Sequence, residues 1–450
     1  DLLHPEVPFM QVADLHTSKN TFAPVSRIIP EAEHDYFTMR TGKGRATLDF
    51  AEAARWVIHT QAYDYSGIKS GAVGDPRLKG GKGYPIGTGW TGMTGGTVVR
   101  GDTLLETLLL NSTESAIGAE AALDKPVWER PQDTATQRIP DAESIAPKGA
   151  ADLATWQERR IRLQFDATEV TGVLVTNGDK IPDAGKNIFG DPMTPYRYSK
   201  NQTKKGVLAY YPQQYDTKRT MWKSLDALIA AEGDAGFGNK VHAPKRPETL
   251  ENLSRIAYEE DTDEVLDLAI VSMAYGPQNS SVDTIVSATM GLPAYLLGDE
   301  TLSRSNRALV RNAAEATKAA ATSLGWFAGQ LFVAAGGEYE FNSDAADRLY
   351  TLLEPKFIAW LRHLKKTDIE QEAIDWQAEV HRNVLEIAAE YVRGAGQKAL
   401  IGRSLDSSDD GSSARIINAG SLYRSLQRKL RDDLPLLPQP THSTPEDSND

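Results

Sequence analysis

The chain has 450 residues, 40% of them hydrophobic, and a formal net charge of −13 at pH 7. This length and composition allow two or three domains, each with a core of its own. Zero cysteines exclude disulfides, thiolate metal sites and a cysteine nucleophile, and the overall acidity argues against a general nucleic-acid binder.

The first 292 residues mix short apolar runs with frequent glycine and proline. Strands are predicted at residues 161–163, 173–176 and 207–211, and helices at residues 48–60 and 221–231. Such a mixture is typical of an irregular α+β fold. We therefore expect a mixed α/β domain over residues 1–292.

From about residue 300 the pattern changes to amphipathic helices, predicted at residues 306–335, 343–366, 369–393 and 417–432. In the third, Ile374, Ala378 and Leu385 recur near the helical period while charged residues occupy the other faces. Four such helices with short connections predict a four-helix bundle over residues 293–434, so the fold class is α+β. The proline-rich acidic tail, residues 435–450, is expected to be disordered.

The sequence shows no sign of a membrane span. No secretory segment opens the chain, and its least charged stretch, residues 269–298, is interrupted by Asp283 and by glycine, proline and amide residues. We therefore expect a cytoplasmic protein without membrane contact.

Basic residues gather in one part of the chain. Residues 180–246 hold nine lysines and three arginines against six acidic residues, whereas residues 251–267 hold seven acidic residues and one arginine. A chain with such segregated charge can bind phosphate on one face while its other faces stay acidic. The net charge alone therefore does not exclude DNA.

Signals for catalysis are weak. Residues 87–92 match GxGxxG, but a β-like segment follows them, which favours a glycine-rich turn over a dinucleotide site. The eight histidines form no HExxH or similar ligand pair, and no GxSxG nucleophile elbow occurs. We expect no catalytic residue, metal or cofactor. An enzyme with a pocket in the α+β domain remains the alternative, with the glycine-rich loop and acidic clusters as its candidate site.

Two segments instead have residue types that can contact nucleic acid. Phe37, Arg40, Lys43 and Arg45, with glycines between the charges, can contact phosphates and sugars or form an ordinary exposed loop. In residues 65–71 (YSGIKSG), small residues flank a lysine. Small residues let a backbone enter a minor groove, although a loop glycine with positive φ is the simpler interpretation.

Four segments occur in the order and rough spacing of one known family. They are residues 4–11 (HPEVPFMQ), 65–71 (YSGIKSG), 98–111, and 275–280 (YGPQNS). With the helical C-terminal region, they resemble the large subunit (CasA family) of the type I-E CRISPR surveillance complex Cascade. The resemblance rests on their order from residue 4 to 280, because no single segment is specific.

The resemblance implies a non-catalytic subunit that recognises the protospacer-adjacent motif in target double-stranded DNA and initiates strand separation for R-loop formation in antiviral defence. Implied partners are the guide RNA complex, the backbone and small Cascade subunits, and the helicase-nuclease of the CRISPR system. The family has a substantial segment before the HPEVPFMQ element, so we expect part of the natural protein to be absent. A scaffold subunit without DNA contact is the other alternative.

The resemblance also implies three DNA-contacting elements. The glycine loop falls on residues 63–67, where backbone approach is expected only at Ser66 and Gly67, because tyrosines and Asp64 replace the family's glycines. Asp64 is expected to turn away from phosphate. The lysine falls on Lys180, in the turn-like sequence NGDK.

The third element is a polar wedge, which falls on Gln278, Asn279 and Ser280. Amide side chains donate and accept hydrogen bonds, which suits a wedge that meets any base. The simpler interpretation of these residues is a polar β-turn. Phe37 and residues 40–45 correspond to a family loop near the DNA and the guide end.

Overall fold

The computed structural model describes residues 1–32, 38–117, 124–182, 189–204, 206–216, 219–234, 236–237, 242–260, 264–405 and 415–438. The chain divides into two compact units. The first comprises Asp1–Glu260 and Leu266–Met290, and the second comprises Asp261–Val265 and Gly291–Asp450.

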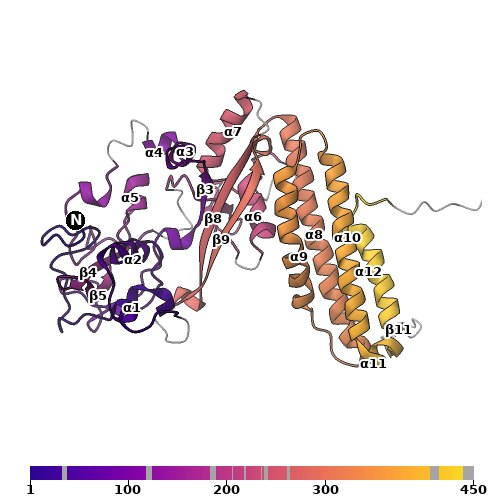
Figure 1. Cartoon of the computed structure of the whole chain (residues 1–450), viewed down its shortest axis with the longest axis horizontal. Helices are drawn as coiled ribbons and strands as arrows, with labels where there is room; N and C mark the ends of the chain where they lie inside the picture. The colour runs from indigo at the N-terminus through magenta and orange to yellow at the C-terminus, as the bar shows by residue number, and fades with distance from the viewer. Residues whose placement is uncertain are drawn as a thin grey trace, which may run out of the picture. The chain divides into compact units, whose positions relative to one another are not determined.

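The first unit combines short helices with small sheets (Figure 1). Its helices are α1 Lys43–Ala46, α2 Phe50–Tyr63, α3 Leu104–Leu110, α4 Glu114–Ile117, α5 Ala150–Ala154, α6 Thr220–Ile229 and α7 Glu248–Glu260. Its strands are β1 Lys69–Ser70, β2 Lys82–Gly83, β3 Gly95–Arg100, β4 Arg159–Phe165, β5 Val170–Asn177, β6 Tyr196–Tyr198 and β7 Tyr210–Pro212, with β8 Val265–Tyr275 and β9 Val282–Pro293 crossing the unit boundary.

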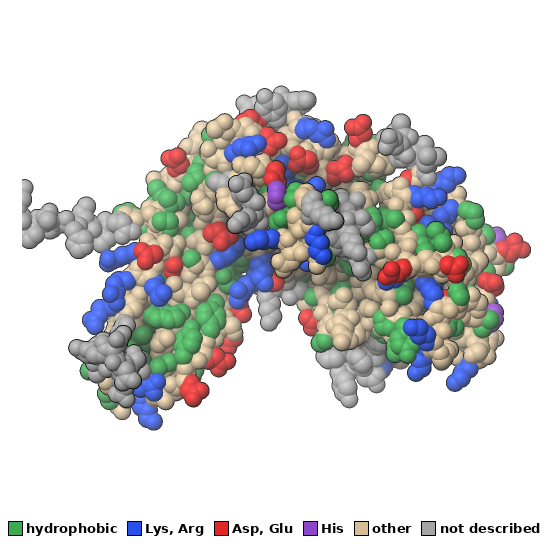
Figure 2. Space-filling view, turned by 180° about the vertical axis from the view of Figure 1, so that it is seen from behind, with side chains coloured by type: hydrophobic (Ala, Val, Ile, Leu, Met, Phe, Trp, Pro, Cys, Tyr) green, Lys and Arg blue, Asp and Glu red, His purple; other side chains and the backbone are tan. Residues whose placement is uncertain are grey.

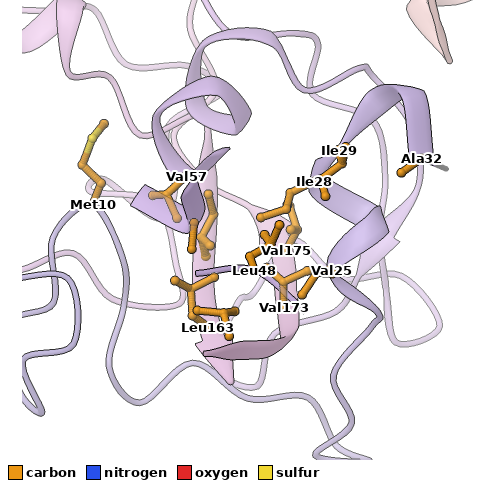
Figure 3. Close-up of a cluster of buried hydrophobic side chains, with 13 residues drawn as sticks. Met10, Val25, Ile28, Ile29, Ala32, Leu48, Val57, Leu163, Val173 and Val175 are labelled. Carbon is orange, nitrogen blue, oxygen red and sulfur yellow. The ribbon is translucent and has the colours of Figure 1, made fainter. Parts of the chain in front are cut away.

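The β4–β5 hairpin builds one apolar core of this unit (Figure 3). The strands pair antiparallel, so that Leu163 lies opposite Val173, and both side chains are buried with Val57 of α2. Helix α2 begins at Phe50, after the N-cap Asp49, whose carboxylate accepts a hydrogen bond from Glu52 N at 2.7 Å. Such an N-cap stabilises a helix by about 1 kcal/mol. The helix ends at Tyr63, the first residue of the predicted glycine loop, where Asp64 N donates to Thr60 O.

A three-stranded sheet of order β3-β8-β9 carries the predicted wedge. Strand β3 pairs antiparallel with β8, from Gly95 opposite Ser272 to Arg100 opposite Asp267. Strands β8 and β9 are hydrogen-bonded neighbours, and the short 3-10 turn Pro277–Asn279 joins them. The hairpin therefore holds this turn at its tip.

The second unit is a helical bundle. Its long helices are α8 Thr301–Ala334, α9 Ser343–His363, α10 Ile369–Gly394 and α12 Ala419–Asp433, which lie side by side (Figure 1). The short helix α11 Gly396–Ile401 and strands β10 Arg403–Leu405 and β11 Arg415–Ile417 lie between α10 and α12 in the chain. Phe327, Phe357 and Trp376, from three of the long helices, are buried. Hydrophobic, basic and acidic side chains mix on the visible face of the bundle (Figure 2).

The predicted α+β class with a C-terminal four-helix bundle is confirmed. The strands predicted at residues 161–163 and 173–176 lie within β4 and β5. The strand predicted at residues 207–211 is mostly wrong, since β7 begins at Tyr210. Gly206 has φ +80° and Val207 bridges back to Lys204, so the chain turns there before the strand starts. Residues 439–450 of the predicted tail lie outside the described residues.

No helix within the described ranges is long and apolar enough to cross a membrane.

Candidate nucleic-acid interface

The predicted glycine loop and the predicted wedge touch each other. Ser66 N donates a hydrogen bond to the backbone oxygen of Asn279 at 2.7 Å. The Tyr275 hydroxyl donates to the backbone oxygen of Tyr63 at 2.9 Å, across 212 positions of the chain. Two separate hydrogen bonds thus fix the 63–67 loop to the β8–β9 hairpin, and the two elements form one surface.

The wedge turn is exposed and holds an unusual backbone. Gln278 and Asn279 have φ values of 57° and 53°, a left-handed conformation that asparagine tolerates better than other non-glycine residues. Gly276 N donates to Ser281 O at 3.0 Å and closes the turn. Within the described part of the chain, the side-chain amide groups of Gln278 and Asn279 have no hydrogen-bond partner, so both can bind a ligand.

A buried carboxylate anchors the loop. Asp64 accepts ion pairs from Arg27 at 2.9 Å, Lys69 at 2.9 Å and Arg159 at 2.6 Å. Burial alone would raise the pKa of Asp64, but Arg159, Arg27 and Lys69 together hold that pKa well below its ordinary value. The carboxylate is therefore ionised, and because its side chain is 4% exposed it turns away from any phosphate at the surface.

The same cations hold the backbone of the loop. Arg159 Nη2 donates to the carbonyl oxygens of Tyr65 at 3.1 Å and Gly87 at 2.7 Å, and Lys69 Nζ donates to Tyr65 O at 2.8 Å. The Tyr65 ring lies 4.1 Å from Lys69 Nζ and 4.8 Å from the guanidinium of Arg27. Burial lowers the pKa of Lys69 to about 7, against the opposing effect of Asp64. These buried side chains thus hold the loop in one conformation before any ligand binds.

Of the two predicted contact residues in the loop, Ser66 is buried and Gly67 is partly exposed. Gly67 does not have the positive φ expected of a loop glycine. A Cβ at Gly67 would lie 3.2 Å from the Tyr65 ring, so the glycine is favoured by limited space and not by backbone conformation. Ser66 acts here as the anchor of the wedge turn, and Gly67 is the residue that a ligand can approach.

Lys180 lies at the same end of the β4–β5 hairpin as the loop anchor. Asn177, the last residue of β5, pairs with Arg159, and Gly178 N continues the ladder to Glu158 O at 2.9 Å. A Cβ at Gly178 would lie 2.3 Å from Gln157 O, so this turn requires glycine. The Lys180 side chain is 30% exposed, and its Nζ lies 3.9 Å from Glu143. This long pair leaves the ammonium group accessible to another anion.

The basic segment is exposed at residues 41–44, but two of its cations are paired. The Arg40 guanidinium pairs with Glu52 at 2.5 Å and Glu31 at 3.3 Å, and Lys43 pairs with Glu169 at 2.9 Å in the short helix α1. Arg45 is partly buried. Carboxylates distant in the sequence therefore neutralise much of this positive charge. Phe37 lies outside the described residues.

No group of three or more histidine, aspartate or glutamate side chains in the described ranges is placed to hold a metal ion. The glycine-rich residues 87–92 lead into the 3-10 turn Thr91–Met93 and strand β3. A Cβ at Gly89 would lie 2.2 Å from Gln61 O, so this glycine serves close backbone packing against α2.

The family model for the CRISPR-associated protein Cse1 matches residues 1–387. The chain belongs to the Cse1 family. The crystal structure of Thermobifida fusca Cse1 is similar over 97% of this chain and 81% of that chain, with 37% identity and a TM-score of 0.81. The resemblance to the CasA family drawn from the four ordered segments is thereby confirmed.

More distant relatives agree with this assignment. CasA/Cse1 of Thermus thermophilus is 26% identical over 268 residues, which is 56% of this chain and 46% of the relative. The chain thus aligns with about half the length of this curated Cse1 relative. A chain of a CRISPR RNA-guided surveillance complex shares the fold, with 18% identity, a TM-score of 0.58, and coverage of 88% of this chain and 79% of that chain.

Proposed function

We propose that this Cse1 family member is a non-catalytic Cascade subunit that recognises the protospacer-adjacent motif in double-stranded DNA and begins strand separation. Family membership supports this proposal, as does the fold shared with a chain of a CRISPR RNA-guided surveillance complex. Its partners are the guide RNA complex, the backbone and small subunits and the helicase-nuclease, in the cytoplasm.

The observation that carries the proposal is the contact between Ser66 N and Asn279 O. It brings the partly exposed backbone at Gly67 close to the turn, where the side-chain amides of Gln278 and Asn279 pair with no residue that the structure describes. A backbone without a bulky side chain can approach a minor groove, and amides can hydrogen-bond to bases once they part. Motif reading and strand opening would then occur at adjacent points of one surface.

If the subunit reads the motif from the minor groove of the DNA, it should tolerate several related motifs. The minor groove presents a degenerate pattern of donors and acceptors, so Gly67 and Lys180 would accept several sequences and reject others. The guide RNA, through base pairing, supplies the remaining specificity. Arg40, Lys43 and Arg45, with Phe37, would add contacts to the sugar-phosphate backbone of the DNA, beside the end of the guide RNA.

We expect binding of the assembled complex to motif-bearing duplex to weaken steeply with salt, in spite of the net charge of −13. With about five phosphate contacts, the affinity should fall roughly 500-fold between about 50 and about 200 mM salt, because each contact releases counterions. A filter-binding titration over that range tests this expectation. An affinity independent of salt would favour a scaffold subunit without DNA contact.

Replacing Lys180 by alanine should weaken binding to motif-bearing duplex by about 1–3 kcal/mol, the usual size of a good base-edge contact. Folding should be unaffected, because the side chain is partly exposed and its pair with Glu143 is long. The measurement is a gel-shift titration with the assembled complex. Lys200→Ala, which removes an exposed lysine from the same unit, is the control. Equal affinities for the two variants would show that Lys180 is not the motif-reading lysine.

A further inference from the structure

A groove of about 860 Å³ lies in the first unit and reaches Asn279 of the wedge turn. Its lining includes Arg197, Tyr211, Gln214, Lys223, Ala274 and Asn279. Clefts of about 300–1,000 Å³ hold ligands of drug size, a class that includes a nucleotide. Among the predicted site residues that the structure describes, Asn279 alone lines this groove.

The groove contains a cation stacked on an aromatic ring. Arg197 of β6 and Tyr211 of β7 are cross-strand partners, and the guanidinium lies 5.0 Å from the centre of the Tyr211 ring. Arg197 is exposed and, among the described residues, pairs with no carboxylate. Aromatic rings and arginine planes are the surfaces on which unpaired bases stack, and an unpaired arginine also binds phosphate.

Hydrogen bonds hold together the part of the groove between the Arg197–Tyr211 pair and the wedge turn. Gln214 Nε2 donates to Gly92 O at 2.7 Å and to Met273 O at 3.0 Å, which fastens the β7 end to strand β8. The Tyr215 hydroxyl is hydrogen-bonded to Thr97 of β3. Lys223 is paired with Asp216 at 2.6 Å, so Arg197 supplies the cation that is open to a new anion. A preformed site of this kind binds without a large ordering cost.

We propose that the groove receives an unpaired nucleotide extruded from the duplex beside the 278–280 turn, with its base stacked on Tyr211 and its phosphate near Arg197. The inference rests on the proposed function, because the turn is what opens the duplex. A base removed from the helix loses stacking energy, and a second stacking surface beside the wedge restores part of it. The groove thereby lowers the cost of the first opened pair.

The test uses assembled complex and motif-bearing duplex with 2-aminopurine at the first pair to open, placed in the target strand in one arm and in the displaced strand in the other. Stacking in the groove should quench the fluorescence in one arm, which identifies the strand. The double variant Arg197→Ala with Tyr211→Ala should lose this quenching and open linear duplex about tenfold more slowly. Tyr211→Phe should behave as wild type, because it keeps the ring.

The control is Arg55→Ala, which removes an exposed arginine of α2 that does not line the groove. The single variant Arg197→Ala covers the case in which the double variant does not fold, and is expected to lose part of the quenching. If wild-type complex shows no motif-dependent opening, the proposed function itself fails. If wild type opens the duplex and the groove variants match it in rate and in fluorescence in both arms, the groove does not hold a nucleotide.

Discussion

Replacing Gln278, Asn279 and Ser280 together by glycine should slow R-loop formation on linear duplex about tenfold or more. Opening stacked pairs costs about 1.4 kcal/mol per step, and a wedge offsets this cost only until guide pairing takes over. If the variant no longer offsets the cost of opening one step, the rate of R-loop formation should fall about tenfold. On a target with a pre-melted bubble at these pairs, or on negatively supercoiled DNA, the variant should form R-loops nearly as fast as wild type. Stopped-flow kinetics with the assembled complex measure these rates.

This variant removes side chains and keeps the turn. Glycine adopts the positive φ of residues 278 and 279 without strain, and the backbone oxygen that accepts from Ser66 N remains. Asn20→Gly is a matched control, since Asn20 is also exposed with a positive φ, of 47°. Equal impairment of the triple variant on bubble and on intact duplex would show that these residues serve general binding or folding, and the wedge assignment would be wrong.

Much of the fold was predictable because local sequence signals agree with it. The bundle helices show a sustained 3.6-residue period, and the apolar runs within β4 and β5 are bounded by polar residues. The strand predicted at residues 207–211 failed because its apolar residues include Val207, which is 73% exposed after a turn at Gly206. A short apolar run does not tell whether its side chains are buried.

The candidate site was only partly predictable. Residue type and order located the 63–67 loop and the 278–280 turn, but their hydrogen bond joins distant parts of the chain, which a single sequence does not reveal. Arg27 and Arg159 were missed as anchors of Asp64. One signal was available: Arg159 stands two residues before the strand predicted at residues 161–163, and a buried arginine needs a carboxylate partner.

The charge pattern of the sequence was the poorest guide to which cations are unpaired in the fold. Arg40 and Lys43 stand on either side of Gly42 and look unpaired in the sequence, yet Glu52 and Glu169 pair with them in the fold. Conversely, Arg197 and Tyr211 are 14 positions apart and meet only because β6 and β7 pair. Local charge therefore locates a basic region, and strand pairing decides which cations stay open to a ligand.

Asp64→Asn should lower the free energy of unfolding of the first unit by about 3–5 kcal/mol, the usual cost of removing one partner from a buried ion pair. The variant removes the carboxylate that Arg27, Lys69 and Arg159 share, and Lys69 and Arg159 are almost fully buried. Arg159 keeps a second pair, with Glu158 at 3.2 Å. Urea unfolding followed by hydrogen exchange of amides in α2 and β4 measures the loss within this unit. Motif binding should fall as well, because the same cations hold the loop carbonyl of Tyr65.

The pH dependence separates charge from packing in this cluster. The pKa of Asp64 is lower in the folded chain than its ordinary value of 3.8, so its contribution to stability is complete above that value and is lost as the pH falls toward the folded pKa. The gap between wild type and Asp64→Asn should therefore narrow below pH 3.8. As the pH falls from about 7, the gap should first widen, because Asp64 raises the pKa of the buried Lys69 and the variant lacks this effect. Lys223→Ala, which breaks an exposed pair with Asp216 in the same unit, should cost less than about 1 kcal/mol. A loss for Asp64→Asn no larger than that of this control would mean that the three cations are stabilised by their backbone contacts, and Asp64 would not be the anchor of the loop.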